Sequence, residues 1–502
     1  MDYLSRIVDG ELDELMSNLP AIVLEGPRAV GKTETARRRA SEVFELDDPA
    51  RLEVVAADPG SLVSSISGTI LFDEWQRHPP LWDFVRRQSE GDAPAGRFLL
   101  TGSAIPTAQP VHPGSGRLVE LRMRPMSLAE RQIETPTIGL GEMLTGDGRA
   151  IAGASAVNLP GYIDEILASG FPGIRPLEGR ARRALLDGYI SRVIDRDFPE
   201  LGLTVRRPAT LRAWLAAYAA ATSTTTTYNK LLGAATPGEA EKPAKTTTIA
   251  YRDVLERLYL VDPVPGWLPT QNRLSRLTQA PKHHLADPAL AAHLVGVDAG
   301  ALLRGDGPAQ LAVRDGSFLG ALFESLVTLS VRVYAQANEA TVHHLRTRDG
   351  DHEVDLIVAR RDDRVVAMEV KLRGAVDDAD VRHLLWLREQ LGDDLLDAAV
   401  ITAGDHAYRR QDGIGVIPAA LLGPLRAPRA ATQRLSMVTR DHQGAREDSF
   451  LHRESCGSGV AGGSRPRVAA DLRILALLTD PWVSCGPEGR DAAHRGRAWR
   501  GR

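Results

Sequence analysis

The residues with the clearest chemical potential form a glycine-rich loop near the start of the chain. The segment Gly26-Pro-Arg-Ala-Val-Gly31-Lys32-Thr33 fits the pattern G-x-x-x-x-G-K-[ST], in which backbone N–H groups turn inward around phosphate oxygens. A helix that opens at the end of this loop adds partial positive charge. Lys32 can then reach the β- and γ-phosphates, and the Thr33 hydroxyl can bind Mg²⁺. The loop therefore predicts a site for a nucleoside triphosphate with Mg²⁺.

The second half of this site is predicted where two apolar runs end. Asp73 and Glu74 follow one run, so Asp73 could hold Mg²⁺ and Glu74 could orient or deprotonate the attacking water. Thr101 and Ser103 end the next run and could sense the γ-phosphate, although Thr-Gly-Ser is also a common turn. We assign catalysis to Lys32 and Glu74, and Mg²⁺ binding to Thr33 and Asp73. The predicted nucleotide-binding residues are Gly26, Pro27, Arg28, Ala29, Val30, Gly31, Lys32, Thr33, Asp73, Thr101 and Ser103.

A second charged group is predicted in the C-terminal half. Glu353–Val358 and Val365–Lys371 have the pattern of two strands joined by a polar hairpin loop. Paired positions in an antiparallel hairpin share a constant sum, and a turn centred on Asp362 gives 724. Since 355 + 369 = 724, Asp355 and Glu369 should be cross-strand neighbours, about 5 Å apart at Cβ.

Two more residues complete this group. Lys371 follows Glu369 by two positions and so points to the same face, and an amphipathic helix from Phe318 can contribute Glu324. Such a set suits Mg²⁺-dependent phosphodiester cleavage: Asp355 and Glu369 would hold the metal, and Lys371 would activate water or steady the phosphate. The predicted catalytic residues here are Glu324, Asp355, Glu369 and Lys371. A salt-bridged hairpin, or a fold that no longer cuts, remains the alternative. Nearby histidines are expected to face solvent: His283, His284, His343, His344 and His352.

The elements that must position the first site alternate between strand and helix. We predict strands at residues 19–25, 52–55, 68–74, 96–103 and 118–123, and helices at 1–18, 33–44 and 82–88. This alternation indicates an α/β fold with a parallel sheet and helices on both faces. Such sheets bind ligands at the carboxyl ends of their strands, where the loop and the acids lie.

The remaining chain divides by pattern. Helices at 208–221 and 246–258, followed by extended arms at 261–267 and 276–285, resemble a helix-turn-helix with a wing; a helical connector is the alternative. The end of the chain is rich in Arg and Gly with little periodicity, which is typical of disorder. The predicted parts are 1–135 (P-loop ATPase domain), 136–205 (linker and helical segment), 206–310 (winged-helix-like domain), 311–424 (α/β restriction-endonuclease-like domain) and 425–502 (Arg/Gly-rich tail).

Composition excludes several classes of protein. The 502 residues are 43% apolar and 25% charged, which is ordinary for a soluble protein, and the length suggests about three domains. No run approaches ~18–20 uninterrupted apolar residues and the N-terminus lacks a signal pattern, so we expect a cytoplasmic protein without a membrane span. Two cysteines exclude a disulfide framework and a Cys-rich zinc site. The net charge of 61 − 65 = −4 excludes a basic nucleic-acid coat, and only six of the 61 basic residues are lysines.

These motifs resemble known families. The loop with Asp73 and Glu74 looks like an AAA-type P-loop ATPase, and the Asp…Glu-x-Lys set resembles the restriction-endonuclease-like fold. Taken in order over nearly all of residues 1–424, the chain resembles a bacterial and archaeal group of AAA-type ATP-binding proteins that carry a C-terminal domain of unknown function. Further segments that carry the resemblance are Leu71–Gln76, Leu99–Ser103, Gly170–Gly173, Tyr189–Asp197 and Pro281–Asp287.

The resemblance implies ATP and Mg²⁺ as cofactors, with DNA open as a partner. AAA-type enzymes often complete their site with an arginine from a neighbour, which leaves a homo-oligomer open. Candidate arginines are Arg117, Arg122, Arg124, Arg192 and Arg196. We expect an ATPase that couples its nucleotide state to a DNA-facing C-terminal module. The alternatives are an ATP-gated, Mg²⁺-dependent DNA nuclease and a non-cutting, nucleotide-dependent switch that binds DNA or protein.

Overall fold

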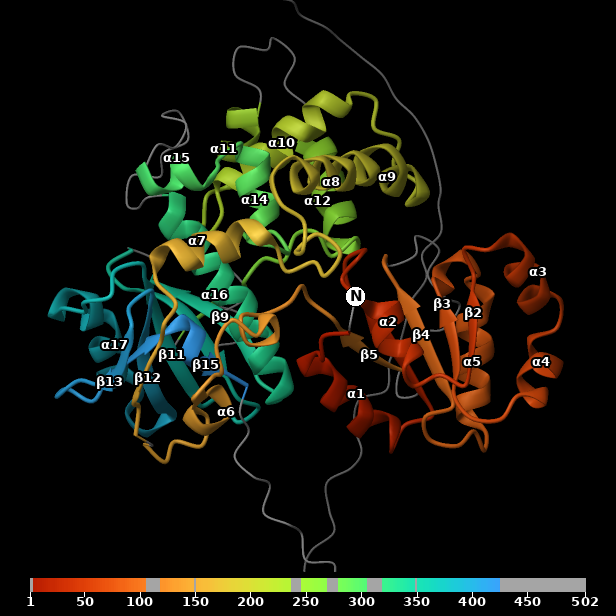
Figure 1. The fold of residues 1–502 in the computed structure, drawn as a ribbon, viewed down its shortest axis with the longest axis horizontal. Coiled ribbons are helices and arrows are strands. Elements are labelled where there is room, and N and C mark those ends of the chain that lie inside the picture. Colours follow the sequence, from red (N-terminus) through yellow and green to blue (C-terminus); the bar gives the residue numbers. More distant parts are fainter. Residues whose placement is uncertain are drawn as a thin grey trace, which may run out of the picture. The chain divides into compact units, whose positions relative to one another are not determined.

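The first domain is a parallel sheet between two layers of helices. The computed structural model describes residues 3–104, 118–148, 150–235, 245–268, 279–304, 318–347 and 350–424; the predicted tail 425–502 and Arg117 lie outside them. The N-terminal elements are α1 (Ile7–Met16), β1 (Ala21–Glu25), α2 (Lys32–Arg37), β2 (Glu42–Glu45), α3 (Pro49–Ala57), α4 (Pro59–Ser65), β3 (Ile70–Asp73), η1 (Trp75–Arg77), α5 (Pro80–Glu90), β4 (Phe98–Gly102) and β5 (Val119–Arg122) (Figure 1).

The strand order of this sheet is β2-β3-β4-β1-β5, and every pair is parallel. Alternate residues of β1 face opposite sides. Ile22 and Leu24 join the core that includes α1 and α2, whereas Ala21 and Val23 join the core that includes α5. This alternation is what a sheet covered on both faces requires. The predicted parallel sheet with helices on both faces is therefore confirmed.

One predicted strand is wrong. Residues 52–55 belong to helix α3, not to a strand. The Asp48 side chain accepts a hydrogen bond from the Ala50 amide at 3.0 Å and Pro49 occupies the first helical turn, which together start a helix. The strand that the sheet needs is β2, so the helix predicted at 33–44 instead ends at Arg37.

The middle of the chain is mostly helical. Its elements are η2 (Ala129–Arg131), β6 (Ile138–Gly139), α6 (Leu140–Met143), β7 (Gly153–Ala154), α7 (Leu159–Ala168), α8 (Gly179–Arg192), η3 (Val193–Asp197), α9 (Phe198–Glu200), α10 (Pro208–Ala220), α11 (Tyr228–Ala235), α12 (Lys245–Arg257), β8 (Gly266–Trp267), α14 (Pro288–Val295) and α15 (Ala299–Arg304). The two predicted arms pair with each other through bridges between Val261 and Leu285 and between Val264 and Lys282. Residues 153–154 and 266–267 join the C-terminal sheet, so the middle of the chain helps to build the C-terminal domain.

The C-terminal domain is a mixed sheet with a helix on each face. Its elements are α16 (Phe318–Ala337), β9 (Thr341–Arg346), β10 (Glu353–Ala359), β11 (Val365–Lys371), α17 (Asp378–Leu391), η4 (Gly392–Asp394), β12 (Leu395–Thr402), β13 (His406–Arg409), β14 (Gly415–Pro418), η5 (Ala419–Leu421) and β15 (Leu422–Gly423). The strand order is β7-β13-β14-β12-β11-β10-β9-β8. Leu356 and Met368 pack in the core with α16, whereas Ile357 and Ala367 pack in the core with α17.

The predicted hairpin register is confirmed. Leu356 pairs with Met368 and Val358 with Val366, and each pair of numbers sums to 724. The β9–β10 ladder shifts register between Val354 and Ile357. Asp355 therefore sits at a bulge, a feature that often re-aims a side chain near a functional site.

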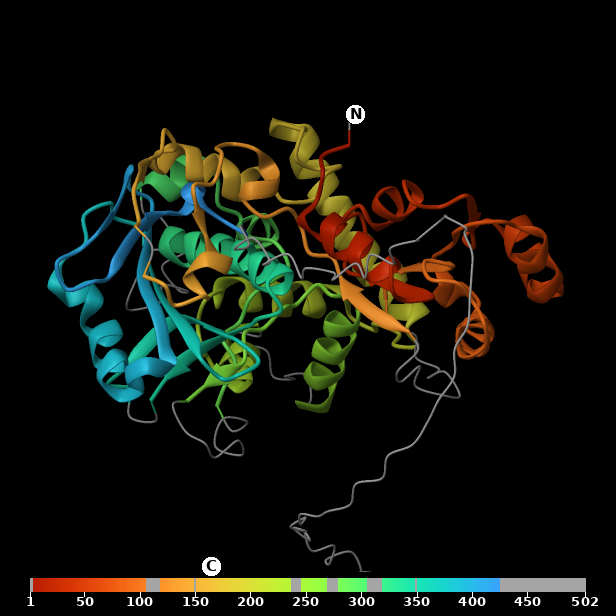
Figure 2. The same ribbon diagram turned by 90° about the horizontal axis from the view of Figure 1, so that it is seen from below.

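Helix α16 is long and apolar enough to cross a membrane by length and composition alone, and it is the only such helix in the described part of the chain. However, 72% of its apolar window is buried inside the protein. It packs against α1 and against the C-terminal strands β9 and β11 (Figure 2). We therefore describe α16 as a core helix.

Candidate nucleotide site and C-terminal acid cluster

The loop after β1 needs its glycines. Gly26 has φ +151° and Gly31 has φ +103°, in the half of conformational space that other residues rarely adopt. A Cβ on Gly26 would also collide with the carbonyl oxygen of Met123. This close approach fixes the start of the loop against the chain that follows β5, so the loop can turn its backbone toward a ligand.

Lys32 lies inside this loop. Its Nζ donates to the carbonyl oxygens of Gly26 at 2.9 Å and Pro27 at 3.0 Å, and the residue is 5% exposed. Burial lowers the pKa of Lys32 to about 8, against the opposing effect of Glu74 and Asp73. A buried ammonium group without a carboxylate in direct contact is suited to bind an anion that enters the loop. These residues therefore fit the phosphates of a nucleotide.

Asp73 gathers the polar side chains that would hold Mg²⁺. The Thr33 hydroxyl donates to its two carboxylate oxygens at 2.9 and 3.1 Å, and the Thr101 hydroxyl also donates to it. Burial raises the pKa of Asp73. A carboxylate and a hydroxyl in contact offer the hard oxygen ligands that Mg²⁺ prefers, so Thr33 and Asp73 fit the ion that usually accompanies the nucleotide.

Glu74 follows Asp73 in the chain and is held by hydrogen bonds from residues outside the phosphate loop. Its backbone has φ +55°, which turns it out of the line of β3. The Ser103 hydroxyl donates to it at 2.9 Å, and the Gln76 amide also donates to it. The predicted residues Glu74 and Ser103 are thus brought together. Gln76 is a further partner of Glu74 that was not predicted from the sequence. It ends the segment Leu71–Gln76, which carries part of the family resemblance.

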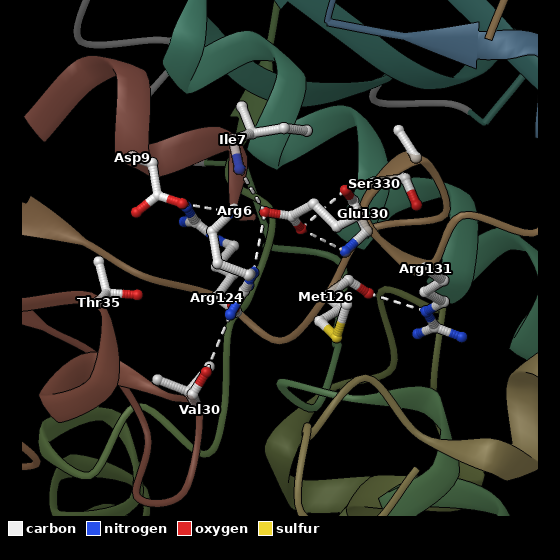
Figure 3. A network of polar contacts seen from close by, with 12 residues as sticks. Arg6, Ile7, Asp9, Val30, Thr35, Arg124, Met126, Glu130, Arg131 and Ser330 are labelled. Atoms are coloured by element: carbon white, nitrogen blue, oxygen red, sulfur yellow. Dashed lines mark hydrogen bonds and ion pairs between the residues drawn. The ribbon is translucent and has the colours of Figure 1, made fainter. Parts of the chain in front are cut away.

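Arg6 ties the loop to the rest of the domain. Its guanidinium donates to the Val30 carbonyl at 2.9 Å and to Glu130 at 3.0 Å, and Glu130 also accepts from the Ile7 amide at 2.8 Å (Figure 3). Arg6 and Glu130 are both buried. This network anchors the loop backbone at Val30 to the buried pair of Arg6 and Glu130. No sequence pattern predicted it, because its two halves lie 124 residues apart.

A segment of the middle domain lies beside the loop. The Tyr189 hydroxyl is 3.5 Å from the Arg28 carbonyl oxygen, and an Asp197 carboxylate oxygen lies 3.7 Å from the Arg28 guanidinium. That oxygen is buried and makes no hydrogen bond among the described residues. Burial raises the pKa of Asp197. Asp197 ends a π-helical turn, a rare conformation that often marks functional sites.

A cavity of about 250 Å³ opens between these parts. From the first domain it is lined by Arg28, Gln76, Arg77, Pro79, Ser103 and Ala104. From the middle domain it is lined by Tyr189, Val193, Asp197, Glu200, Leu201, Leu258 and Leu260. Residues of both domains therefore line this cavity, and Ser103, which was predicted to lie near the γ-phosphate, is among them.

Asp262 joins three arginines. Its carboxylate lies 3.2 Å from Arg122, 2.9 Å from Arg124 and 3.0 Å from Arg332. Of the arginines considered as candidates to complete the site of a neighbouring chain, Arg122 and Arg124 therefore already form ion pairs within their own chain. Arg192 lies 3.8 Å from Asp197, and Arg196 is exposed.

The structure brings the predicted C-terminal residues together. Lys371 Nζ donates to Glu369 at 2.7 Å and lies 4.0 Å from Asp355. The Asp355 carboxylate also accepts from the Val370 amide at 2.9 Å. Glu324 reaches the same place from α16.

A residue that the sequence did not assign sits at the centre of this group. Lys282 Nζ lies 2.8 Å from Glu324, 3.0 Å from Asp355 and 3.7 Å from Glu353. We call Lys282, Glu324, Asp355, Glu369 and Lys371 the acid cluster. The signals of Lys282 in the sequence were the scarcity of lysines and its place in the segment Pro281–Asp287, which carries part of the family resemblance.

Burial and the two ammonium groups set the charges of this cluster. Burial raises the pKa of Glu324 to about 8, although Lys282 opposes this rise. Burial also raises the pKa of Glu369 well above its usual value. Burial would raise the pKa of Asp355 too, but Lys282 and Lys371 hold it below its usual range. The cluster is thus an anionic Asp355 between two cations, flanked by two carboxyl groups that can hold protons.

The expectation that the histidines face solvent is wrong for three of them. His283, His284 and His344 are buried. The ring of His283 packs against Tyr218 and Tyr228, and His344 shares a hydrogen bond with the Ala280 carbonyl oxygen at 2.9 Å. No group of three or more acidic, His or Cys side chains in the described ranges is arranged to hold a metal ion.

Comparison with known families agrees with the first site. Residues 18–132 match the model of the AAA domain family. This part of the chain is therefore similar to AAA-type P-loop ATPase domains. Residues 160–301 match a domain of unknown function, DUF8612, and residues 319–422 match another, DUF4143. The part that matches the AAA domain family thus contains the loop and Glu74. Lys282 and Glu324 lie in parts that match two different families of unknown function.

Two relatives that match most of the chain carry the name uncharacterized protein. One from Mycobacterium bovis and one from Mycobacterium tuberculosis are each 26% identical over 431 residues, covering 82% of this chain and 83% of theirs. Among solved structures, the Walker-type ATPase PABY2304 of Pyrococcus abyssi matches 58% of this chain and 96% of its own, with a TM-score of 0.36 and 15% identity. Drosophila ORC bound to DNA matches 60% of this chain and 95% of its own, with a TM-score of 0.20 and 13% identity. Scores this low carry no argument about this chain.

Proposed function

We propose that the chain hydrolyses ATP and that its nucleotide state changes how the middle domain binds the phosphate loop. The observation that carries this proposal is the cavity between Arg28 and Ser103 on one side and Tyr189 and Asp197 on the other. A γ-phosphate bound at Lys32 would bring negative charge toward Arg28, and would thereby compete with Asp197 for it. Hydrolysis and release of phosphate would return Arg28 to Asp197.

In this proposal each residue of the ATPase site has one task. Lys32 and the loop amides bind the phosphates, Thr33 and Asp73 hold Mg²⁺, and Glu74 orients the attacking water. Mg²⁺ supplies charge neutralisation at the phosphates when bound. Glu74 is held by Ser103, so a γ-phosphate that attracts the Ser103 hydroxyl would free the carboxylate to act.

The change would pass on to the C-terminal domain through buried contacts. Asp262 links Arg122, the last residue of β5, and Arg124, which follows that strand, to Arg332 on α16. The α16 side chain of Gln336 donates to the Arg122 carbonyl oxygen at 2.9 Å. A movement at the end of β5 would therefore reach α16, and with it Glu324.

We propose DNA as the partner of this module. Two observations support this proposal: the restriction-endonuclease-like set Asp355, Glu369 and Lys371, and the resemblance of α10–α12 and the paired arms to a winged helix. The geometry favours a switch that does not cut over a nuclease, because Lys282 fills the acid cluster. We also propose a homo-oligomer in which a neighbouring chain supplies an arginine to the nucleotide site, because Arg122 and Arg124 are paired with Asp262 within their own chain.

Hydrogen exchange tests the coupling. Glu74→Gln protein with ATP and Mg²⁺ should show changed amide protection in residues 189–201 relative to the same protein with ADP. Lys32→Ala protein is the matched control and should show no difference between the nucleotides. Identical protection with ATP and ADP would refute coupling while leaving ATP hydrolysis itself intact.

DNA binding and cutting need separate assays. Fluorescence anisotropy should show different DNA affinities with ATP and ADP, and equal affinities would remove DNA from the proposal. Plasmid nicking with Mg²⁺ that is lost in both Asp355→Ala and Lys371→Ala would instead establish the nuclease alternative.

A further inference from the structure

Backbone hydrogen bonds hold Lys282 in place independently of its side-chain contacts. Its amide donates to the Val264 carbonyl at 2.9 Å, and its own carbonyl accepts from the Val264 amide at 2.9 Å. Its neighbours His283 and His284 are buried. The side chain therefore enters the acid cluster from a held arm, and Lys282 is 1% exposed.

The ammonium group of Lys282 lies where a divalent ion bound by Asp355 and the neighbouring Glu324 would lie. The other predicted metal ligand, Glu369, is instead paired with Lys371. A cation shared by Glu324 and Asp355 must lie between their oxygens, and Lys282 Nζ is already there at 2.8 and 3.0 Å. Mg²⁺ would need those oxygens at ~2.0–2.1 Å with several waters around it. The buried ammonium already occupies the place between those oxygens, so the cluster does not fit the metal that the nuclease-like resemblance implies.

Charge supports the same conclusion. Lys371 lies 2.7 Å from Glu369 and 4.0 Å from Asp355, so the cluster already holds two cations. A divalent ion beside both would meet two like charges within a buried region, where screening by water is weak. Only six lysines occur against 55 arginines, and two of the six meet at this point. The ammonium group of lysine is a compact point charge, whereas the guanidinium group of arginine is broad and planar, so lysine is the closer match to a small ion.

We propose that Lys282 acts as a tethered cation that replaces the divalent metal of the C-terminal acid cluster and keeps this cluster metal-free. The cation is supplied by the middle domain, from the arm that precedes α14, and its partners belong to the C-terminal domain. The cluster would therefore be a joint between two domains. This inference does not depend on ATP hydrolysis.

Removal of the ammonium tests the proposal directly. Lys282→Gln removes the cation shared by Glu324 and Asp355, and leaves Asp355 with the more distant ammonium of Lys371 at 4.0 Å. Mn²⁺ should then bind beside Glu324 and Asp355. Mn²⁺ is titrated into the full chain without nucleotide, and free ion is followed by electron paramagnetic resonance. We expect Lys282→Gln to bind one more Mn²⁺ ion per chain than the wild type, at a site that depends on Asp355.

Two matched variants separate this site from the phosphate loop, which every protein in the series retains. Lys282→Gln/Asp355→Asn should lose the gained site, and Asp355→Asn alone should bind as much Mn²⁺ as the wild type. A wild-type Mn²⁺ site that disappears in Asp355→Asn would overturn the proposal. So would a folded Lys282→Gln protein, shown by circular dichroism, that gains no site.

Stability provides a second readout. Because a ligand that binds only the folded state stabilises it, Mn²⁺ should raise the Tm of Lys282→Gln but not that of Lys282→Gln/Asp355→Asn. If Lys282→Gln does not fold without metal, refolding in Mn²⁺ should rescue it. Failure of that rescue would count against the proposal, as would an Asp355-dependent Mn²⁺ site in the wild type.

Discussion

Replacement of Asp262 by asparagine should destabilise the protein strongly. The carboxylate lies within 3.2 Å of three guanidinium groups, and its side chain is 8% exposed. Asp262→Asn keeps the shape but leaves three arginines without their shared anion. Removal of one partner from a buried ion pair costs about 3–5 kcal/mol, and we expect the upper part of this range because Arg124 and Arg332 are themselves largely buried.

Urea unfolding followed by circular dichroism measures this cost, with the wild type and Asp253→Asn as references. Asp253 is a matched control, since its carboxylate lies 3.0 Å from Arg252 but is 53% exposed. Its loss should cost no more than about 1 kcal/mol. Equal unfolding midpoints for Asp262→Asn and Asp253→Asn would refute the view that the Asp262 cluster joins the domains.

The pH dependence of this difference has a fixed sign. Burial would raise the pKa of Asp262, but Arg122, Arg124 and Arg332 hold it far below its usual value. A carboxyl group with a lowered folded-state pKa contributes stability that is fully present above its unfolded value of about 3.9. That contribution is lost as the pH falls below this value. The gap between wild type and Asp262→Asn should therefore be constant from about pH 5 to 7 and narrow below about pH 4.

Three further predictions concern the nucleotide site. Glu74→Gln should retain ATP binding but lose turnover by about 100-fold or more, as expected for a residue that activates water; unchanged turnover in a phosphate-release assay would remove Glu74 from that role. Because the pKa of Lys32 is lowered to about 8, ATP binding at about pH 9 should take up a proton as phosphate restores the charge; identical calorimetric heats in buffers of different ionisation enthalpy would contradict this. Gly26→Ala should abolish ATP binding because its Cβ would collide with Met123, and calorimetry that shows wild-type affinity would disprove this requirement.

Local patterns were sufficient for several parts of the structure. The loop from Gly26 to Thr33 is defined by neighbouring residues, and its place between a strand and a helix follows from its own flanks. The hairpin register follows from one turn centre, Asp362, so Asp355 and Glu369 could be paired from their numbers alone. These features depend on contacts between residues that are close together in the sequence.

Other parts depend on contacts that no local pattern carries. Lys282 meets Glu324 and Asp355 across 42 and 73 residues, and nothing beside it in the sequence marks it as their partner. The strand expected at 52–55 failed for a different reason. Its β-branched residues suggested a strand, but the cap at Asp48 and the proline after it determined a helix. The burial of His283 was also missed. The tyrosines that cover its ring, Tyr218 and Tyr228, belong to helices far from it in the sequence.

The central claim is that this chain binds ATP through Lys32. Isothermal titration of the full chain with ATP and Mg²⁺, beside the same titration of Lys32→Ala, tests it most directly. We predict saturable heat with one nucleotide per chain for the wild type and none for Lys32→Ala. Equal heats for the two proteins, or no heat for a folded wild-type protein, would contradict the account.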